Sequence, residues 1–369
     1  MRYEDKFLVD MCKATEAISQ NISYDGMDWD YLLKQAIAHE VVGFLYKPLW
    51  GNRRIPRYIN ELIEAKYYYQ KQTGFIKIRE FHNVIKKIQE QGVTAVILKG
   101  MYLVPELYCD TGLRSFGDLD ILVDITDITR VDKVLRSIGY VQGKYNSKAE
   151  SIQEYSPKKL KQYADNLQHE AEYVRKLECD GIGYYFCKID VHKRINTYND
   201  GNIIPVSDLL DRSVEFISKY GGKYRRLSNE DMLVHLCYHN YWHTQSLQDI
   251  FRRTDASLKL YTDIRTCIKY MSPDIRKAMQ YAQVMDILLP VQYSLYFTQK
   301  LFGDVLSFDN IKYLGDINAI EKEGHIIRDR WIAPHQEIGK FECDYLTRMF
   351  DYQRFAKIDL LSTEFGTRS

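Results

Sequence analysis

The 369-residue sequence lacks the features that mark disulfide-stabilised and membrane-spanning proteins. Its seven cysteines are odd in number and scattered, with no C-x-x-C pair, which argues against a disulfide framework or a zinc ribbon and for a reducing compartment. No apolar run approaches the roughly 20 residues needed to cross a bilayer. Charged side chains interrupt the N-terminal segment, so we expect no signal peptide. These absences predict a cytoplasmic protein with no membrane partner.

The chain also lacks an excess of charge of either sign. Its 51 Lys and Arg against 50 Asp and Glu give a formal net charge of +1, so composition provides no strong nucleic-acid signal. The 30 tyrosines are interpreted as amphipathic packing residues at the margin of the core. They are not interpreted as a stacking platform for nucleic acid, because no charge excess accompanies them. The chain length favours two or three domains or subdomains.

The spacing of apolar residues divides the chain into three regions. Residues 1–90 repeat apolar positions every three or four residues, which predicts an N-terminal helical region whose last helix ends at Gly92. Residues 91–204 combine strand-like and helical stretches and predict an α/β core. The helical period returns over 206–220 and continues, so 205–369 are predicted to be a C-terminal helical region. The predicted fold class is therefore α+β.

The stretch 97–124, ILKGMYLVPELYCDTGLRSFGDLDILVD, contains two acids at strand spacing. Residues i and i+2 of a strand share a face, so Asp118 and Asp120 are expected to point the same way. Adjacent carboxylates repel each other unless a cation lies between them, which favours a Mg²⁺ site. The alternative is a solvated strand end that carries two surface acids.

A third acid, Asp190, lies in a later strand-like stretch, KIDVH, with His192 on the same face. If that strand lies beside the first, the three carboxylates can hold two Mg²⁺ ions together with phosphate oxygens and water. Two such ions stabilise the attacking and leaving oxygens of a displacement at phosphorus. Asp190 is then the carboxylate best placed to take a proton from an incoming hydroxyl.

Residues before the acid pair fit a phosphate ligand. Lys99 and Gly100 end a strand and open a helix, where glycine lets the backbone approach an anion. Arg114 can donate two hydrogen bonds to a phosphate, and Gly117 leaves room for the chain to enter the acidic strand. Each of these residues, taken alone, is more simply explained as a surface residue. The prediction of a phosphate site depends on all of them occurring in this order.

The ordered motifs L-K-G, Tyr108, Arg114, G-D-L-D-I-L-V, S-I-G-Y and I-D-V-H-K-R resemble the uncharacterised nucleotidyltransferase family, within the DNA polymerase beta-like superfamily. The resemblance implies a small mixed β-sheet core flanked by helices. It also implies Mg²⁺-dependent transfer of a nucleoside monophosphate from an NTP to a hydroxyl, with release of pyrophosphate. The wider superfamily has a Gly-Ser or Gly-Gly pair closer to the acids, whereas 17 residues separate Gly100 from Asp118 here.

Under this resemblance, Asp118, Asp120 and Asp190 are the metal ligands and catalytic acids. Lys99, Gly100, Arg114 and Gly117 form the nucleotide-binding part. The expected partners are an NTP, ATP among them, and an acceptor that is a small molecule, a protein or RNA. The alternative is a catalytically silent protein that uses the same fold to bind a nucleotide or a partner.

Three further residues are candidates for contact with substrate: His192, Glu172 and His239. Glu172 precedes the Asp190 strand, where the alternative is a solvated strand face. His239 lies between His235 and His243 at four-residue spacing, on one face of a predicted helix. That spacing also permits a zinc site, so a zinc-dependent hydrolase is a second alternative.

Overall fold

The computed structural model describes residues 1–13, 24–146, 148–166, 169–179, 183–195, 205–329 and 333–361. The chain forms two compact units. The central unit is Tyr68–Met232, and the flanking unit combines Met1–Tyr67 with Leu233–Ser369. Strands and helices are both abundant, which confirms the α+β fold class. The three predicted regions, 1–90, 91–204 and 205–369, were defined by their secondary structure and not by contacts between residues. Their boundaries therefore stay a prediction.

An eight-stranded mixed sheet is the framework of the central unit. Its order is β4-β3-β5-β6-β2-β1-β8-β7, with β2 parallel to β6 and β1 parallel to β8. The other neighbours are antiparallel. The strands are β1 (Val96–Ile97), β2 (Leu119–Leu122), β3 (Val141–Asn146), β4 (Ser151–Glu154), β5 (Tyr173–Cys179), β6 (Gly183–His192), β7 (Val214–Ile217) and β8 (Lys223–Arg226).

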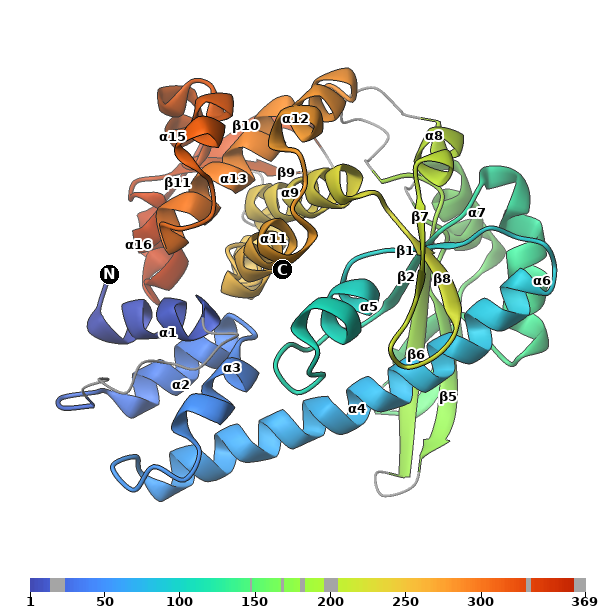
Figure 1. Cartoon of the computed structure of the whole chain (residues 1–369), viewed down its shortest axis with the longest axis horizontal. Coiled ribbons are helices and arrows are strands. Elements are labelled where there is room, and N and C mark those ends of the chain that lie inside the picture. The colour runs from blue at the N-terminus through green and yellow to red at the C-terminus, as the bar shows by residue number, and fades with distance from the viewer. Residues whose placement is uncertain are drawn as a thin grey trace. The chain divides into compact units, whose positions relative to one another are not determined.

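Helices cover both faces of this sheet. Figure 1 shows the sheet nearly edge-on, with α5 on one side and α6 and α7 on the other. The helices are α5 (Gly100–Tyr102), which continues as a π-helical turn over Leu103–Tyr108, a 3₁₀ turn over Ile125–Asp127, α6 (Ile128–Ser137), α7 (Pro157–Asn166) and α8 (Val206–Asp211). The long α4 (Arg57–Gln89) begins in the flanking unit, and Gly92 follows it at φ 71°, which confirms the predicted helix end.

The flanking unit is mainly helical. Its helices are α1 (Tyr3–Lys13), α2 (Trp29–Ala38), α3 (Val42–Leu49), most of α9 (Asn229–Gln245), α10 (Leu247–Arg252), α11 (Leu258–Met271), α12 (Ile275–Val284), α13 (Leu288–Phe302), α14 (Phe308–Ile311), α15 (Ile317–Glu323) and α16 (Tyr345–Phe350), with 3₁₀ turns at Lys312–Leu314 and Arg354–Lys357. A small sheet, in the order β11-β10-β9, completes it: β9 (Ile326–Asp329), β10 (Ala333–Phe341) and β11 (Ile358–Leu360).

Two stretches predicted to be helical are strands. Val214–Ile217 forms β7 because it pairs antiparallel with β8, a partner that local periodicity does not show. The prediction of helices throughout the C-terminal region is also wrong for β8, the partner of β7, and for β9 to β11. There Ile327, Ile338 and Phe341 pack against α10 in a buried cluster, so tertiary packing decides the conformation.

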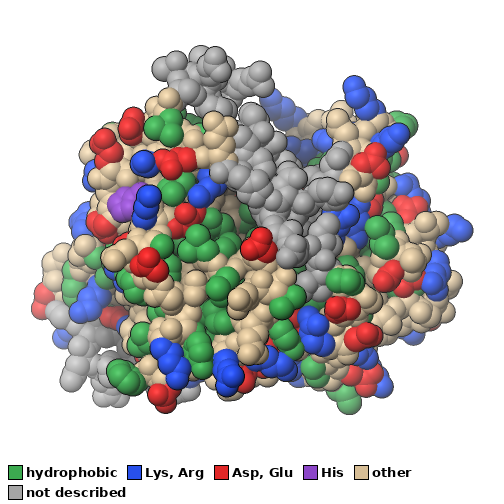
Figure 2. Space-filling model, turned by 90° about the horizontal axis from the view of Figure 1, so that it is seen from above, with side chains coloured by type: hydrophobic (Ala, Val, Ile, Leu, Met, Phe, Trp, Pro, Cys, Tyr) green, Lys and Arg blue, Asp and Glu red, His purple; other side chains and the backbone are tan. Residues whose placement is uncertain are grey.

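Surface charge agrees with the near-neutral composition. Figure 2 shows acidic and basic side chains interspersed over the face in view, and those coloured there form no continuous field of one sign. Among the described residues, every helix is too short or too polar to traverse a bilayer.

Candidate active site

The three predicted acids meet where β2 and β6 lie side by side. The parallel register pairs Asp120 on β2 directly with Asp190 on β6, and Asp118 comes one residue before β2 begins. The alternate residues Leu119 and Ile121 are fully buried, so they fix which face of the strand the acids occupy. The predicted neighbourhood of the two acidic strands is confirmed.

Asp120 is held by two cationic or hydrogen-bonding partners. Lys99 Nζ lies 2.8 Å and His192 Nε2 lies 2.9 Å from its Oδ1. Burial raises the pKa of Asp120, but the Lys99 charge and the His192 hydrogen bond outweigh burial and hold that pKa well below its usual range. Burial and the Lys99 charge together lower the pKa of His192 to about 4. Neutral His192 therefore donates through Nε2–H and fixes the orientation of the Asp120 carboxylate.

Lys188 lies among the other carboxylates. Its Nζ is 2.7 Å from Glu172 Oε2, 3.2 Å from Asp118 Oδ2 and 3.8 Å from Asp190 Oδ2. Burial lowers the pKa of Lys188. The charges of Asp190 and Asp118 and the hydrogen bond to Glu172 raise that pKa by more than burial lowers it, so the pKa of Lys188 lies above its usual value. One ammonium group is thus shared among three acids.

Asp190 is the least satisfied member of the cluster. Its Oδ1 is buried and has no hydrogen-bond partner among the described residues. Burial, together with the negative charge of Asp118, raises the pKa of Asp190 to about 8. A buried carboxylate oxygen without a donor is costly unless a ligand completes it, which marks Asp190 as a binding or catalytic candidate.

Glu172 belongs to this cluster rather than to a solvated strand face. Tyr155 donates a hydrogen bond of 2.5 Å to its Oε1, while Lys188 approaches its Oε2. Burial raises the pKa of Glu172, but the bonds from Lys188 and Tyr155 outweigh it and lower that pKa. Sequence reasoning missed Lys188 and Tyr155. The spacing of Lys188, two residues before Asp190 on one strand face, was the available signal for Lys188.

The predicted nucleotide-binding residues occupy two different settings. Lys99 has φ 46° and points its ammonium at Asp120, while Gly100 opens α5 directly after it. A Cβ at Gly100 would lie 2.8 Å from Arg114 Nη1 and 2.7 Å from Phe116 Cβ. Arg114 is 5% exposed and also donates through Nη1 to the Ser115 carbonyl oxygen. A Cβ at Gly117, by contrast, would meet nothing within 4 Å.

His239 lies in the other unit, on the α9 segment that belongs to the flanking unit. The rings of His235, His239 and His243 follow one another, with centroid separations of 6.3 and 4.6 Å, as their spacing predicted. Among the residues that the structure describes, no three His, Cys, Asp or Glu side chains are arranged to hold a metal ion. The zinc alternative therefore has no ligand set in the described residues.

The acidic site still has the chemistry for Mg²⁺. Three carboxylates supply the hard oxygen ligands that Mg²⁺ prefers, and Oδ1 of Asp190 has a lone pair with no donor. The ammonium of Lys188 already lies near Asp118 and Asp190, so these acids are neutralised by lysine as the structure stands. The residues fit the ion once Lys188 withdraws from them.

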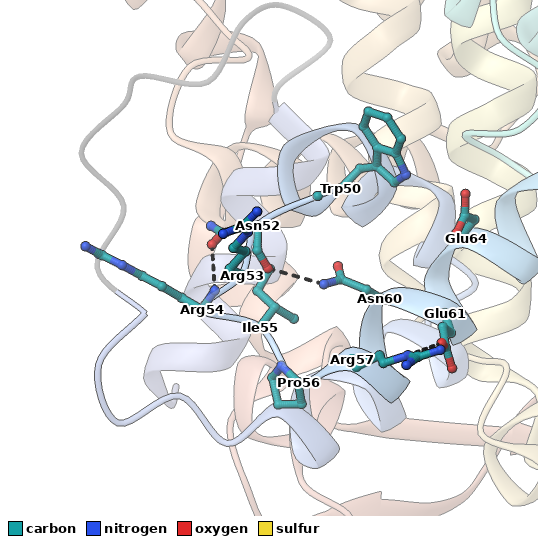
Figure 3. Close-up of a pocket in the computed structure, with 11 residues that line it drawn as sticks. Trp50, Asn52, Arg53, Arg54, Ile55, Pro56, Arg57, Asn60, Glu61 and Glu64 are labelled. Atoms are coloured by element: carbon teal, nitrogen blue, oxygen red, sulfur yellow. Dashed lines mark hydrogen bonds and ion pairs between the residues drawn. The ribbon is translucent and has the colours of Figure 1, made fainter.

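The flanking unit contains a separate open depression of about 710 Å³. Figure 3 shows it between the loop that carries Trp50 and the start of α4. Arg57 and Glu61 form an ion pair of 2.6 Å there, and Asn60 donates to the Asn52 carbonyl oxygen. None of the predicted site residues lines this depression.

Comparison with known proteins gives one assignment. No curated protein and no solved structure matches the chain. The model of the family described as "Uncharacterised nucleotidyltransferase" matches residues 25–303, a span that includes all three acids, Lys99, Glu172 and Lys188. The match covers well over half of the 369 residues. The chain therefore belongs to the uncharacterised nucleotidyltransferase family.

Proposed function

We propose that this protein is a Mg²⁺-dependent nucleotidyltransferase that moves a nucleoside monophosphate from an NTP to a hydroxyl acceptor and releases pyrophosphate. The observation that carries the proposal is the β2–β6 register, which sets Asp120 beside Asp190 and leaves Oδ1 of Asp190 without a donor. Family membership supports the same chemistry at a coarser level.

Asp118, Asp120 and Asp190 would hold the metal. Bound there, Mg²⁺ supplies charge neutralisation at the phosphate oxygens and alignment of the attacking and leaving oxygens. His192 keeps the Asp120 carboxylate oriented through its 2.9 Å hydrogen bond. Asp190 accepts the proton of the acceptor hydroxyl as that oxygen bonds to the α-phosphorus. The bond from the α-phosphorus to the bridging oxygen breaks, and pyrophosphate leaves with the electron pair.

The Lys99–Gly100 turn would receive the triphosphate. The Lys99 ammonium is 2.8 Å from Asp120, so it lies beside the proposed metal ligands and can pair with phosphate charge as well. The space outside Gly117 would admit the nucleotide next to Asp118. Small molecules, proteins and RNA ends all remain acceptor classes for this reaction.

A second candidate is a catalytically silent protein that binds a nucleotide or a partner with this fold. The supporting observation is that Lys99 and Lys188 already neutralise the acids. A silent protein would bind NTP at the same affinity with and without Mg²⁺ and would release no pyrophosphate.

The test is transfer from NTPs labelled at the α-phosphate, in the presence of Mg²⁺, to whole-cell extract sorted into protein, RNA and small-molecule fractions. Asp118→Asn should lower transfer by about 10²–10³, whereas the matched variant Asp165→Asn, on the exposed face of α7, should retain it. Equal labelling by wild type and Asp118→Asn would contradict the proposal. NTP binding without any labelled product would favour the silent protein.

A further inference from the structure

Lys188 is placed differently from the other lysine of the acidic cluster. Lys99 serves one carboxylate, Asp120, which His192 also orients. Lys188 is shared by three carboxylates at 2.7 to 3.8 Å, from Glu172, Asp118 and Asp190. Its side chain is 31% exposed, whereas that of Asp190 is 13% exposed, so the lysine is the more accessible of these two residues.

The contacts of Lys188 form a graded series. The shortest is to Glu172, whose carboxylate Tyr155 holds from the other side. The contacts to Asp118 at 3.2 Å and to Asp190 at 3.8 Å are longer than the 2.7 Å contact to Glu172 by 0.5 and 1.1 Å. An ammonium and a divalent cation compete for the same carboxylate oxygens. Glu172 is therefore the partner that Lys188 can keep when the other two are taken.

Asp118 and Asp190 both approach the Lys188 ammonium, at 3.2 and 3.8 Å. Without a cation between them, two neighbouring ionised carboxylates repel each other. The Lys188 ammonium supplies the missing positive charge.

Building on the proposed function, we propose that Lys188 is a resident counter-ion of the metal site. It holds Asp118 and Asp190 together before metal binds, withdraws to Glu172 when the cation arrives, and so lowers the affinity of the free protein for the metal. Lys188 and Glu172 are thus positioning residues that act through the aspartates. Tyr155 keeps Glu172 turned toward Lys188.

The test measures Mn²⁺ binding by titration calorimetry on the full-length protein, without nucleotide and without any activity assay. Lys188→Met should bind Mn²⁺ about tenfold more tightly than wild type, because the competing ammonium is gone. It should also melt at a lower temperature without metal and regain that loss on adding Mn²⁺. The matched control is Lys176→Met on β5, whose ammonium lies 4.3 Å from the Tyr184 ring centroid; it should change neither property.

Glu172→Gln should act in the opposite direction and weaken Mn²⁺ binding, since Lys188 then keeps only the aspartates. A simple loss of negative charge would also weaken binding, so the double variant decides. If Lys188 must withdraw to Glu172, then Glu172→Gln has no further effect once Lys188 is Met. Additive effects of the two substitutions would overturn the proposal. Lys188→Gln repeats the test if Lys188→Met fails to fold.

Failure of this inference is distinguishable from failure of the proposed function. Mn²⁺ binding that disappears in Asp118→Asn but is unchanged in Lys188→Met would overturn the role of Lys188 alone. Absence of Mn²⁺ binding in every variant, Lys188→Met included, would overturn both the counter-ion and the metal site.

Discussion

Each unit of this protein contains a buried cluster of charge, and the two clusters are completed in different ways. In the flanking unit, Asp255 is fully buried, and both its oxygens are taken: Oδ2 by Arg348 at 3.0 Å and Oδ1 by Arg354. The two guanidinium groups are tied further to backbone carbonyl oxygens, and Arg354 Nε alone lacks a partner among their described atoms. In the central unit, by contrast, a carboxylate oxygen of Asp190 has no donor.

The difference separates a cluster that stabilises a fold from one that can bind a ligand. Where buried guanidinium groups hold both carboxylate oxygens, an outside cation would have to displace them. Where acids outnumber the ammonium group that they share, an outside cation completes the set. We therefore expect substitutions in the flanking cluster to lower the free energy of unfolding. Substitutions in the central cluster are expected to lower the rate of nucleotidyl transfer.

The largest effect is expected for Asp255→Asn. It leaves two buried guanidinium groups without their counter-charge, so the free energy of unfolding should fall by about 3–5 kcal/mol. Urea denaturation followed by circular dichroism measures the loss. The matched control is Asp304→Asn, which also loses an arginine partner, Arg265, but whose side chain is 53% exposed; it should change stability by less than about 1 kcal/mol. Comparable losses in both variants would remove the distinction drawn for Asp255.

The reverse pattern is expected for Asp118→Asn in the central unit. Lys188 retains Glu172 and Asp190, so the urea midpoint should stay close to that of wild type. Nucleotidyl transfer should fall by about 10²–10³, the loss typical of removing one electrostatic stabiliser of a transition state. Measuring both quantities on one preparation sharpens the comparison. If Asp118→Asn loses stability while its folded fraction keeps wild-type activity, the acidic cluster has a structural role and not a catalytic one.

A third difference should appear when the pH is lowered. Burial, and then the positive charge of Arg354, lowers the pKa of His39 in the flanking unit to about 3. The unfolded chain titrates this histidine near 6.5, so below that pH the unfolded state binds more protons and stability falls. From pH 7.5 to pH 5 the loss attributable to His39 should be about 2 kcal/mol.

Urea denaturation of wild type and His39→Asn at pH 7.5, 6.5 and 5 isolates this contribution. The variant should show a shallower decline by that amount, because every other titrating group is common to both proteins. Parallel declines would mean that His39 is not buried in its neutral form. The Leu258 N–H donates to His39 Nδ1, so the asparagine keeps an acceptor for it.

The sequence predicted which acids lie near one another but did not predict their counter-charges. That Asp118 and Asp120 share a strand face follows from strand alternation, which is a local signal, whereas the position of Asp190 beside them depended on β6 becoming the neighbour of β2. The roles of Lys188 and Glu172 depend on which strands become neighbours, and β5, β6 and β2 come from residues 119 to 192. The strands β7 to β11 were missed for the same reason, since their pairing partners decide their conformation.

The two glycines predicted to serve the nucleotide show this limit most clearly, and they yield the smallest expected effects. Sequence reasoning gave Gly100 and Gly117 similar roles. In the structure, Gly100 packs against Phe116 and Arg114, whereas Gly117 faces open space. Gly100→Ala should therefore destabilise the protein by about 1–3 kcal/mol through overpacking. Gly117→Ala should change stability by no more than about 0.5 kcal/mol.

For nucleotide binding, we expect a marked effect of the substitution at Gly117. A methyl group at Gly117 would enter the space beside Asp118, so NTP affinity with Mg²⁺ should fall about tenfold in Gly117→Ala. Thermal melting and NTP titration on both variants test this. If Gly117→Ala keeps wild-type affinity, the open space at that residue is not where the nucleotide enters. In that case the approach to the metal site must be sought along the Lys99 side of the acidic cluster, where the ammonium already faces Asp120.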